Sequence, residues 1–420
     1  MACPSGSFML FGMATTRTDR NFRAFLTSQA ASQSGTWLQF VSLAWLAAEL
    51  TGSGTALGWI AAATFGPLLV LGPLTGTLAD RFDKHRLLIA TQLLVVGQAA
   101  ALGAVILTGT TDMTFLYGLA LAFGLLHAVD NPLRRAFLAE VVDQDRIPRA
   151  VSLNGAVTSA GRVLGPVSAG ALIASVGIGW CFIATAVSYV VALSFLPLIR
   201  RDALRITEVA REPRAVRAGL RYAWSVPELR IALLLTAVVA TFGFNHQVLV
   251  PLVTDTFVGS IGAYTLLYTA IGVGSVVGAL SVAHRDEIEL RFLVFGVIAF
   301  AVANGLIALS PNLALAVFSC AATGVTASVF VTAATTLLQQ RCVPAMRGRV
   351  MALSAMVLLG GLPIGGPIVG WICDVAGPRA GLAVGSLAAM LAAAVVLPRL
   401  PRSRRVCPGS LPESSLITAS

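Results

Sequence analysis

The sequence predicts an all-α membrane protein with twelve transmembrane helices, arranged as two pseudo-symmetric six-helix bundles. Three observations lead to this fold class. The composition is too apolar for a water-soluble chain, Lys and Arg gather on one predicted side of the membrane, and a set of short motifs recurs at an offset of 200 residues.

The apolar composition predicts the spans. Of the 420 residues, 56% are apolar and 11% are charged, whereas a soluble domain carries about 25% charged residues. A helix needs roughly 20 apolar residues to cross a hydrocarbon core. Twelve such stretches follow one another, near residues 22–49, 55–79, 87–108, 113–137, 150–175, 179–199, 230–255, 262–283, 290–309, 313–338, 347–374 and 378–397.

The distribution of Lys and Arg predicts the orientation, because cytoplasmic loops near a membrane accumulate these residues. With the N-terminus in the cytoplasm, 27 of the 29 fall in cytoplasmic tails, loops and the linker, Arg134 among them. The exceptions are Arg162, inside a span, and Arg379, in an outer turn. We therefore expect both termini in the cytoplasm. We attribute the net charge of +10 to topology and not to nucleic-acid binding.

The internal repeat predicts how the chain is divided. Three features match in one register: residues 149–153 with 349–353, 165–170 with 365–370, and Gly177 with Gly377. The expected organisation is a cytoplasmic tail (1–20), an N-terminal bundle (21–199), a basic cytoplasmic linker (200–229), a C-terminal bundle (230–398) and a disordered cytoplasmic tail (399–420).

Other functional classes find little support in the residues. The six cysteines show no CxxC or Cys/His clustering, so we expect no metal site and no disulfide framework. The N-terminus lacks the pattern of a cleaved signal peptide. No GxxxxGK[ST] loop occurs, which disfavours direct coupling to ATP and leaves an ion gradient as the energy source. We expect no cofactor and no enzymatic activity.

The loop after the second span reads GTLADRFDKHR, from Gly76 to Arg86. Small residues before the turn let two helices approach closely, and Asp80 and Arg81, followed by Lys84 and Arg86, can pair across a neighbouring helix end. A simple basic loop on the cytoplasmic side is the alternative interpretation.

The fifth span carries Gly161, Gly165, Pro166 and Gly170. Proline removes a helix hydrogen bond and glycines allow close packing, so this run predicts a kinked, tightly packed helix.

These two motifs resemble the signature loop of the major facilitator superfamily and the antiporter motif of its drug-exporting members. The likeness extends over residues 20–400, to the branch that includes the enterobactin exporter, multidrug efflux pumps and transmembrane secretion effectors. Asp83 stands where the signature loop has its second glycine. The resemblance implies a proton-driven exporter in a bacterial plasma membrane, with Gly76, Asp80, Arg81, Lys84 and Arg86 acting as a conformational latch.

Two charged residues inside spans are candidates for proton coupling or a charge relay, because intramembrane charges are costly unless they are paired or functional. Arg162 lies halfway through span five, and Asp130, on span four, is its obvious partner. Arg162 can alternatively contact substrate or make a purely structural salt bridge to another helix. Asp130 can carry a proton or pair structurally with Arg81, Lys84 or Arg86.

Polar and aromatic residues at helical spacing indicate the walls of a substrate cavity. The candidates are Gln29, Ser32, Gln33, Trp37, His127, Asn154, Arg162, Phe242, Asn245 and His246. Of these, His246 can alternatively be a hydrogen-bonded packing residue.

The sequence therefore predicts a monomeric, proton-coupled exporter of a small organic molecule, such as a drug, an antibiotic or a siderophore-like metabolite. A proton-independent facilitator and a non-transporting receptor or scaffold are the alternatives.

Overall fold

A computed structural model describes residues 17–81, 83–109, 111–200, 215–257, 259–282, 285 and 287–399, and no strand occurs in this part of the chain. The first helices are α1 (Arg17–Thr51), α2 (Gly54–Arg81), α3 (Lys84–Leu107), α4 (Met113–Val141), α5 (Ile147–Val176) and α6 (Gly179–Phe195). The later ones are α7 (Ala215–Ser225), α8 (Pro227–Val238), the π-helical turn η4 (Val239–Gly243), α9 (His246–Asp255), α10 (Ile261–Val282), α11 (Leu290–Leu309), α12 (Leu313–Arg341), α13 (Pro344–Ala376) and α14 (Pro378–Val396).

The membrane-spanning character is confirmed for most of the predicted segments. Eleven helical segments of the described residues are long and apolar enough to cross a membrane, with α8, η4 and α9 counted together as one. Helix α1 is not among them, because Gln, Ser and Thr interrupt its apolar sequence. The twelfth span, at 22–49, therefore stays a prediction.

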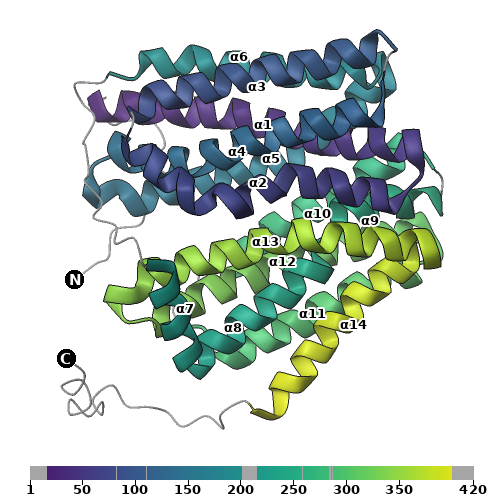
Figure 1. Cartoon of the computed structure of the whole chain (residues 1–420). Helices are drawn as coiled ribbons and strands as arrows, with labels where there is room; N and C mark the ends of the chain where they lie inside the picture. Colours follow the sequence, from purple (N-terminus) through teal and green to yellow (C-terminus); the bar gives the residue numbers. More distant parts are fainter. Residues whose placement is uncertain are drawn as a thin grey trace, which may run out of the picture.

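The helices form two groups with the same internal pairing (Figure 1). In the first group α2 packs on α4, α3 on α6, and α1 on α5. In the second, α10 packs on α12, α11 on α14, and η4 on α13. These are equivalent pairs under the 200-residue repeat, so two related bundles account for the fold.

The linker between the groups is only partly described. Residues 201–214, together with 1–16 and 400–420 of the predicted tails, lie outside the described residues. Within the predicted linker, α7 is a helix that the sequence analysis did not predict. It packs on α13, where Gly219 lies against Arg349.

Contacts between the groups are made by α2 with α13 and by α5 with α10. We call the end of the molecule where α1 leads into α2 and α13 leads into α14 the outer end, following the orientation predicted from the charges. There a Cβ atom on Gly58 or Gly370 would overlap the backbone of the facing helix. The facing pairs Gly58–Gly366 and Gly54–Gly370 thus allow the backbones of α2 and α13 to touch.

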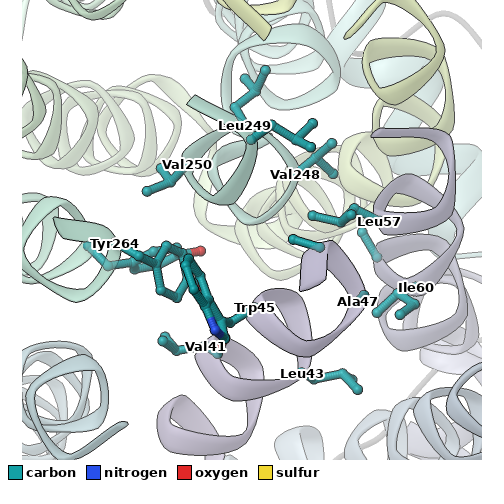
Figure 2. Close-up of a cluster of buried hydrophobic side chains, with 14 of the residues drawn as sticks. Val41, Leu43, Trp45, Ala47, Leu57, Ile60, Val248, Leu249, Val250 and Tyr264 are labelled. Carbon is teal, nitrogen blue, oxygen red and sulfur yellow. The ribbon is translucent and has the colours of Figure 1, made fainter. Parts of the chain in front are cut away.

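An apolar cluster joins the groups near this end (Figure 2). The Trp45 ring of α1 stacks on the Tyr264 ring of α10 with centroids 5.0 Å apart. The Tyr264 hydroxyl donates to the carbonyl oxygen of Val41 at 3.0 Å. Val248 and Leu249 of α9 belong to the same cluster, so α1, α2, α9 and α10 are held together there.

A polar contact adds to this closure. Asp374, near the end of α13, accepts hydrogen bonds from the backbone N–H groups of Gly54 (2.6 Å) and Thr55 (3.0 Å) and from the Ser53 hydroxyl (2.9 Å). The carboxylate therefore caps the first turn of α2 from the opposite bundle, where helix N–H groups lack partners of their own.

Candidate functional site

The N-terminal bundle contains a buried network of charged and polar side chains. Asp130 and Arg134 lie one helical turn apart on α4 and are 3% and 5% exposed. Arg134 Nε donates to the Asp130 carboxylate, and its Nη1 donates to Gln29 Oε1 on α1 at 2.6 Å. Asp130 Oδ1 and Arg134 Nη2 are buried without a partner. The pair is neutral overall, yet each member keeps an unused hydrogen-bonding atom.

This pairing corrects two expectations. Asp130 pairs with Arg134, so neither Arg162 nor the described bases of the signature loop is its partner. Counting Arg134 with a cytoplasmic loop was also wrong, because α4 continues to Val141 and keeps that side chain inside the bundle. Residues four apart on a helix face one another, which explains the choice of partner.

The polar stripe of α1 faces the interior of the same bundle. Ser32 and Gln33 are buried beside Gln29, and the role of these three side chains in a substrate cavity stays a prediction. Farther along α1, the Thr36 and Tyr189 hydroxyls lie 2.7 Å apart. The stripe continues with Gln39, whose amide donates to the Gln98 side chain of α3. Polar contacts therefore link α1 to α3, α4 and α6.

His127 lies one turn before the ion pair, within an aromatic cluster. Its ring stacks on Phe123 at 5.3 Å and meets Phe40 edge-on at 5.9 Å. Phe40 also contacts Phe65 and Trp37, at 5.4 and 5.7 Å. Nδ1 of His127 is buried without a partner. The structure thus brings the predicted residues His127 and Trp37 to one aromatic wall.

The signature loop is described from Asp83 onward. Lys84 pairs with Glu140 of α4 at 2.6 Å, an acid that the sequence analysis did not single out. Asp83 accepts from the backbone N–H of Arg86 at 3.0 Å and so caps α3, with a φ of −57°. An ordinary backbone conformation therefore accommodates the residue that replaces the family glycine. The Arg86 guanidinium is exposed.

The remaining latch residues stay untested. The side chains of 72–82 lie outside the described residues, and these include Gly76, Asp80 and Arg81. The latch is therefore a proposal for these three positions.

The glycines of span five mark where α5 meets its neighbours. Gly161 and Gly165 lie against α1 at Gln33 and Trp37, where a Cβ atom would crowd the backbone. Gly170 lies against α10, in the other bundle. Pro166 lies inside α5 without ending it. The motif packs α5 onto both halves of the molecule.

Arg162 lies in the middle of this motif. Its guanidinium carbon is 5.4 Å from the centre of the Trp37 ring, and its side chain is exposed. Asn154, two turns earlier on α5, keeps a buried Oδ1 without a partner. The structure therefore brings Arg162 to Trp37, while Asp130 pairs with Arg134 instead.

The predicted seventh span is interrupted, which the sequence analysis missed. The π-helical turn η4 separates α8 from α9, and Asn245 follows it with its amide donating to the Thr241 carbonyl at 2.7 Å. Phe242 lies within η4. His246 Nε2 and Asn304 Oδ1 are buried without hydrogen bonds. Single π-turns inside helices are frequent at functional sites.

The site contains residues that sequence reasoning missed. Periodicity carried a signal for Arg134, which follows Asp130 by four residues, and for Gln98, a polar residue inside an apolar span. Glu140, Tyr189 and Asn304 carried no comparable signal, because only the packing of distant helices brings them to their partners.

Solved structures of membrane transporters share this arrangement of helices. The chain superposes on a bacterial homologue of the human lysosomal transporter Spinster, in an inward-facing and unoccupied conformation, with a TM-score of 0.68 at 15% identity, covering 92% of this chain and 96% of that one. It superposes on the nucleoside transporter NupG with a TM-score of 0.70 at 12% identity, covering 93% and 100%. The chain has the fold of these transporters, and a family profile that matches most of its length makes it a multi-pass membrane protein of the major facilitator superfamily.

Within that class, the chain belongs to the transmembrane secretion effector family, whose profile matches residues 13–406. It is 25% identical to the staphyloferrin A transporter of Staphylococcus aureus over 59% of this chain and 62% of that protein, less than two thirds of its length. Longer matches are to the multidrug efflux pump Tap of Mycolicibacterium fortuitum (27%, covering 87% and 93%) and the enterobactin exporter EntS of Escherichia coli (25%, covering 94% and 95%).

Proposed function

We propose that this transporter exports a small organic molecule across the plasma membrane of a bacterium by proton antiport. The observation that carries the proposal is the buried Asp130–Arg134 pair, in which one carboxylate oxygen has no partner. Ionisable residues inside a membrane protein are costly and mark proton or substrate pathways. In this proposal Asp130 is the proton carrier. The positively charged Arg134 side chain stabilises the Asp130 carboxylate when that group is deprotonated.

The names of the relatives support export. Tap is an efflux pump and EntS is an exporter of enterobactin, so a drug, an antibiotic or a siderophore-like metabolite is the proposed cargo. The charge distribution supports an orientation with both termini in the cytoplasm, and a monomer is the proposed state.

The contacts between the bundles support alternating access, in which one half rocks against the other. Asp374, the facing glycines of α2 and α13, and the Trp45–Tyr264 stack hold the outer end closed. In the opposite state these contacts separate. The loop with Asp80, Arg81 and Lys84 then acts as the latch at the other end.

A broad screen of cells with and without the protein would first supply a substrate. The purified chain is then reconstituted in proteoliposomes, and proton movement driven by that substrate is recorded. We expect Asp130→Asn to abolish proton movement, while Asp112→Asn, which changes an exposed acid on the loop before α4, leaves it intact. Transport indifferent to an imposed pH gradient would establish a facilitator, and no transport of any compound would favour a receptor or scaffold.

A further inference from the structure

Arg162 carries a charge at the depth where a membrane protein least tolerates one. It lies near the middle of α5, which runs from Ile147 to Val176. A guanidinium at that depth is costly unless it faces water or a partner. The environment of Arg162 therefore bears directly on what this transporter binds.

Within the described residues, the Arg162 side chain makes no ion pair and no hydrogen bond. The guanidinium carbon lies over the face of the Trp37 ring, 5.4 Å from its centre. Asp130 and Arg134, which also lie within a span, neutralise each other. The positive charge of Arg162 is left without a counter-charge from the described part of the protein.

The helical position of Arg162 directs its side chain toward the seam between the bundles. Each residue advances a helix by about 100°, so Leu164 and Val167 point to the opposite side of α5. These two are 53% and 50% exposed, as expected of a lipid-facing surface. Helix α1 meets α5 at Gly165, and Gly272 of α10 lies against the Arg162 backbone. The guanidinium therefore lies between α1 of one bundle and α10 of the other.

The surroundings of this guanidinium also specify an apolar partner. Trp37 is half-buried and connects through Phe40 to the rings of Phe65 and Phe123. A ligand that reaches Arg162 from the seam meets the Trp37 ring beside it. An arginine fork binds carboxylates with paired, charge-assisted hydrogen bonds, and an aromatic ring accepts a flat apolar group.

We infer that the substrate is an organic anion, whose carboxylate binds Arg162 and whose apolar or aromatic body packs on Trp37. This inference rests on the proposed transport function and names its substrate class. The inference favours organic anions over organic cations, a choice that the names of the multidrug pump and the siderophore exporter leave open. A cation would be repelled by Arg162.

The test measures binding to the full-length chain in lipid nanodiscs by calorimetry. The probes are 2-naphthoate, its neutral analogue 2-naphthamide, and citrate as a polar acid. We expect 2-naphthoate to bind at least 10-fold more tightly than 2-naphthamide. Arg162→Gln is expected to weaken binding of both acids by about 10- to 100-fold, as loss of a charged hydrogen-bond pair implies.

Matched variants separate binding from folding. Arg149→Gln removes an exposed arginine from the cytoplasmic end of the same helix and is expected to leave both affinities unchanged. Arg162→Lys keeps the charge and is expected to retain part of the acid affinity. Trp37→Leu is expected to weaken 2-naphthoate more than citrate. An unchanged thermal unfolding midpoint shows that each variant is folded.

Three results would overturn the inference: equal affinity for the acid and its amide, no binding of either acid, or full acid affinity in Arg162→Gln. Binding requires no proton gradient, so the assay is independent of the transport proposal. An acid that binds at Arg162 but is never transported would refute only the transporter mechanism. Proton-coupled efflux of a cation alone would refute only the anion assignment.

Discussion

The two bundles share a backbone frame but fill it with different side chains. Gly124 of α4 lies against α2, where a Cβ atom would come 2.9 Å from the carbonyl carbon of Thr64. Gly324, 200 residues later on α12, lies against α10, and its Cβ atom would come 2.9 Å from the carbonyl carbon of Ile271. The fourth helix of each bundle therefore packs on its neighbour at the same position.

The chemistry one and a half turns farther along differs. Asp130 and Arg134 of α4 correspond to Phe330 and Ala334 of α12, which lie in the apolar core of the C-terminal bundle. Replacing a buried ion pair with well-packed apolar residues is often neutral or stabilising. The C-terminal bundle shows that this fold does not need the pair, so we attribute the pair to function.

The largest effect is expected when the pair is broken. Arg134→Ala leaves the Asp130 carboxylate buried without the partner that donates to it, and removal of one member of a buried pair costs about 3–5 kcal/mol. The free energy of unfolding in detergent measures this loss.

The double variant Asp130→Leu/Arg134→Met makes these two positions of the N-terminal bundle apolar, like the equivalent positions of the C-terminal bundle. We expect stability close to that of the unaltered chain and no substrate-driven proton movement. A double variant as unstable as Arg134→Ala would mean that the pair is structural, and the comparison of the bundles would lose its functional meaning.

The shared glycine frame predicts equal losses in the two bundles. Gly124→Ala and Gly324→Ala each force a methyl group against a facing backbone, which costs about 1–3 kcal/mol. Gly118, also on α4, has open space around it, so Gly118→Ala is expected to stabilise the helix by up to about 1 kcal/mol. Thermal unfolding midpoints of the three variants test the prediction, and unequal losses at 124 and 324 would break the equivalence.

The joints between the bundles are asymmetric at the outer end. Asp374 caps α2 from α13, whereas Ala174 is the equivalent residue of α5, and α10 is capped by its own Ser260. Loss of a cap costs roughly 0.5–2 kcal/mol. Asp374→Ala should therefore increase opening of the outer end by about 2- to 30-fold.

The neighbouring Cys373 can report this opening, because its side chain is buried against Gly54 of α2. A Cβ atom on Gly54 would lie 2.9 Å from the Cβ atom of Cys373. With the other cysteines replaced by serine, an impermeant maleimide added from outside is expected to label Cys373 faster in Asp374→Ala. Asp112→Ala, at a helix start without a side-chain cap, is the control. Equal labelling rates in the unaltered chain, Asp374→Ala and Asp112→Ala would show that Asp374 does not hold the outer end closed.

The smallest effect is expected at the far end of α4. Glu140 binds Lys84, and the equivalent Gln340 accepts a hydrogen bond from the backbone N–H of Ile288 at 3.1 Å. Because a neutral amide suffices in the C-terminal bundle and the new amide oxygen can still accept from Lys84, Glu140→Gln should cost about 1 kcal/mol in unfolding free energy. A larger loss would show that charge at this loop is needed for stability.

The span pattern, the repeat and the family could be predicted because each depends on local composition. Apolar length, loop charge and glycine spacing are read directly along the chain. Part of the site could be predicted in the same way, since Asp130, Arg162 and Trp37 are conspicuous in apolar surroundings. Their partners could not, because Arg134 was counted with the cytoplasmic charges although it lies within the predicted span 113–137, one helical turn after Asp130.

The sequence by itself determined that this chain is a helical membrane protein with two related halves, because the bilayer demands long apolar helices whatever their packing. Only the tertiary structure decided which charges meet. It paired Asp130 with Arg134, inserted the turn η4 before Asn245, and left Arg162 facing the seam with Trp37. Those outcomes depend on how helices distant in the chain approach each other, which composition and periodicity do not encode.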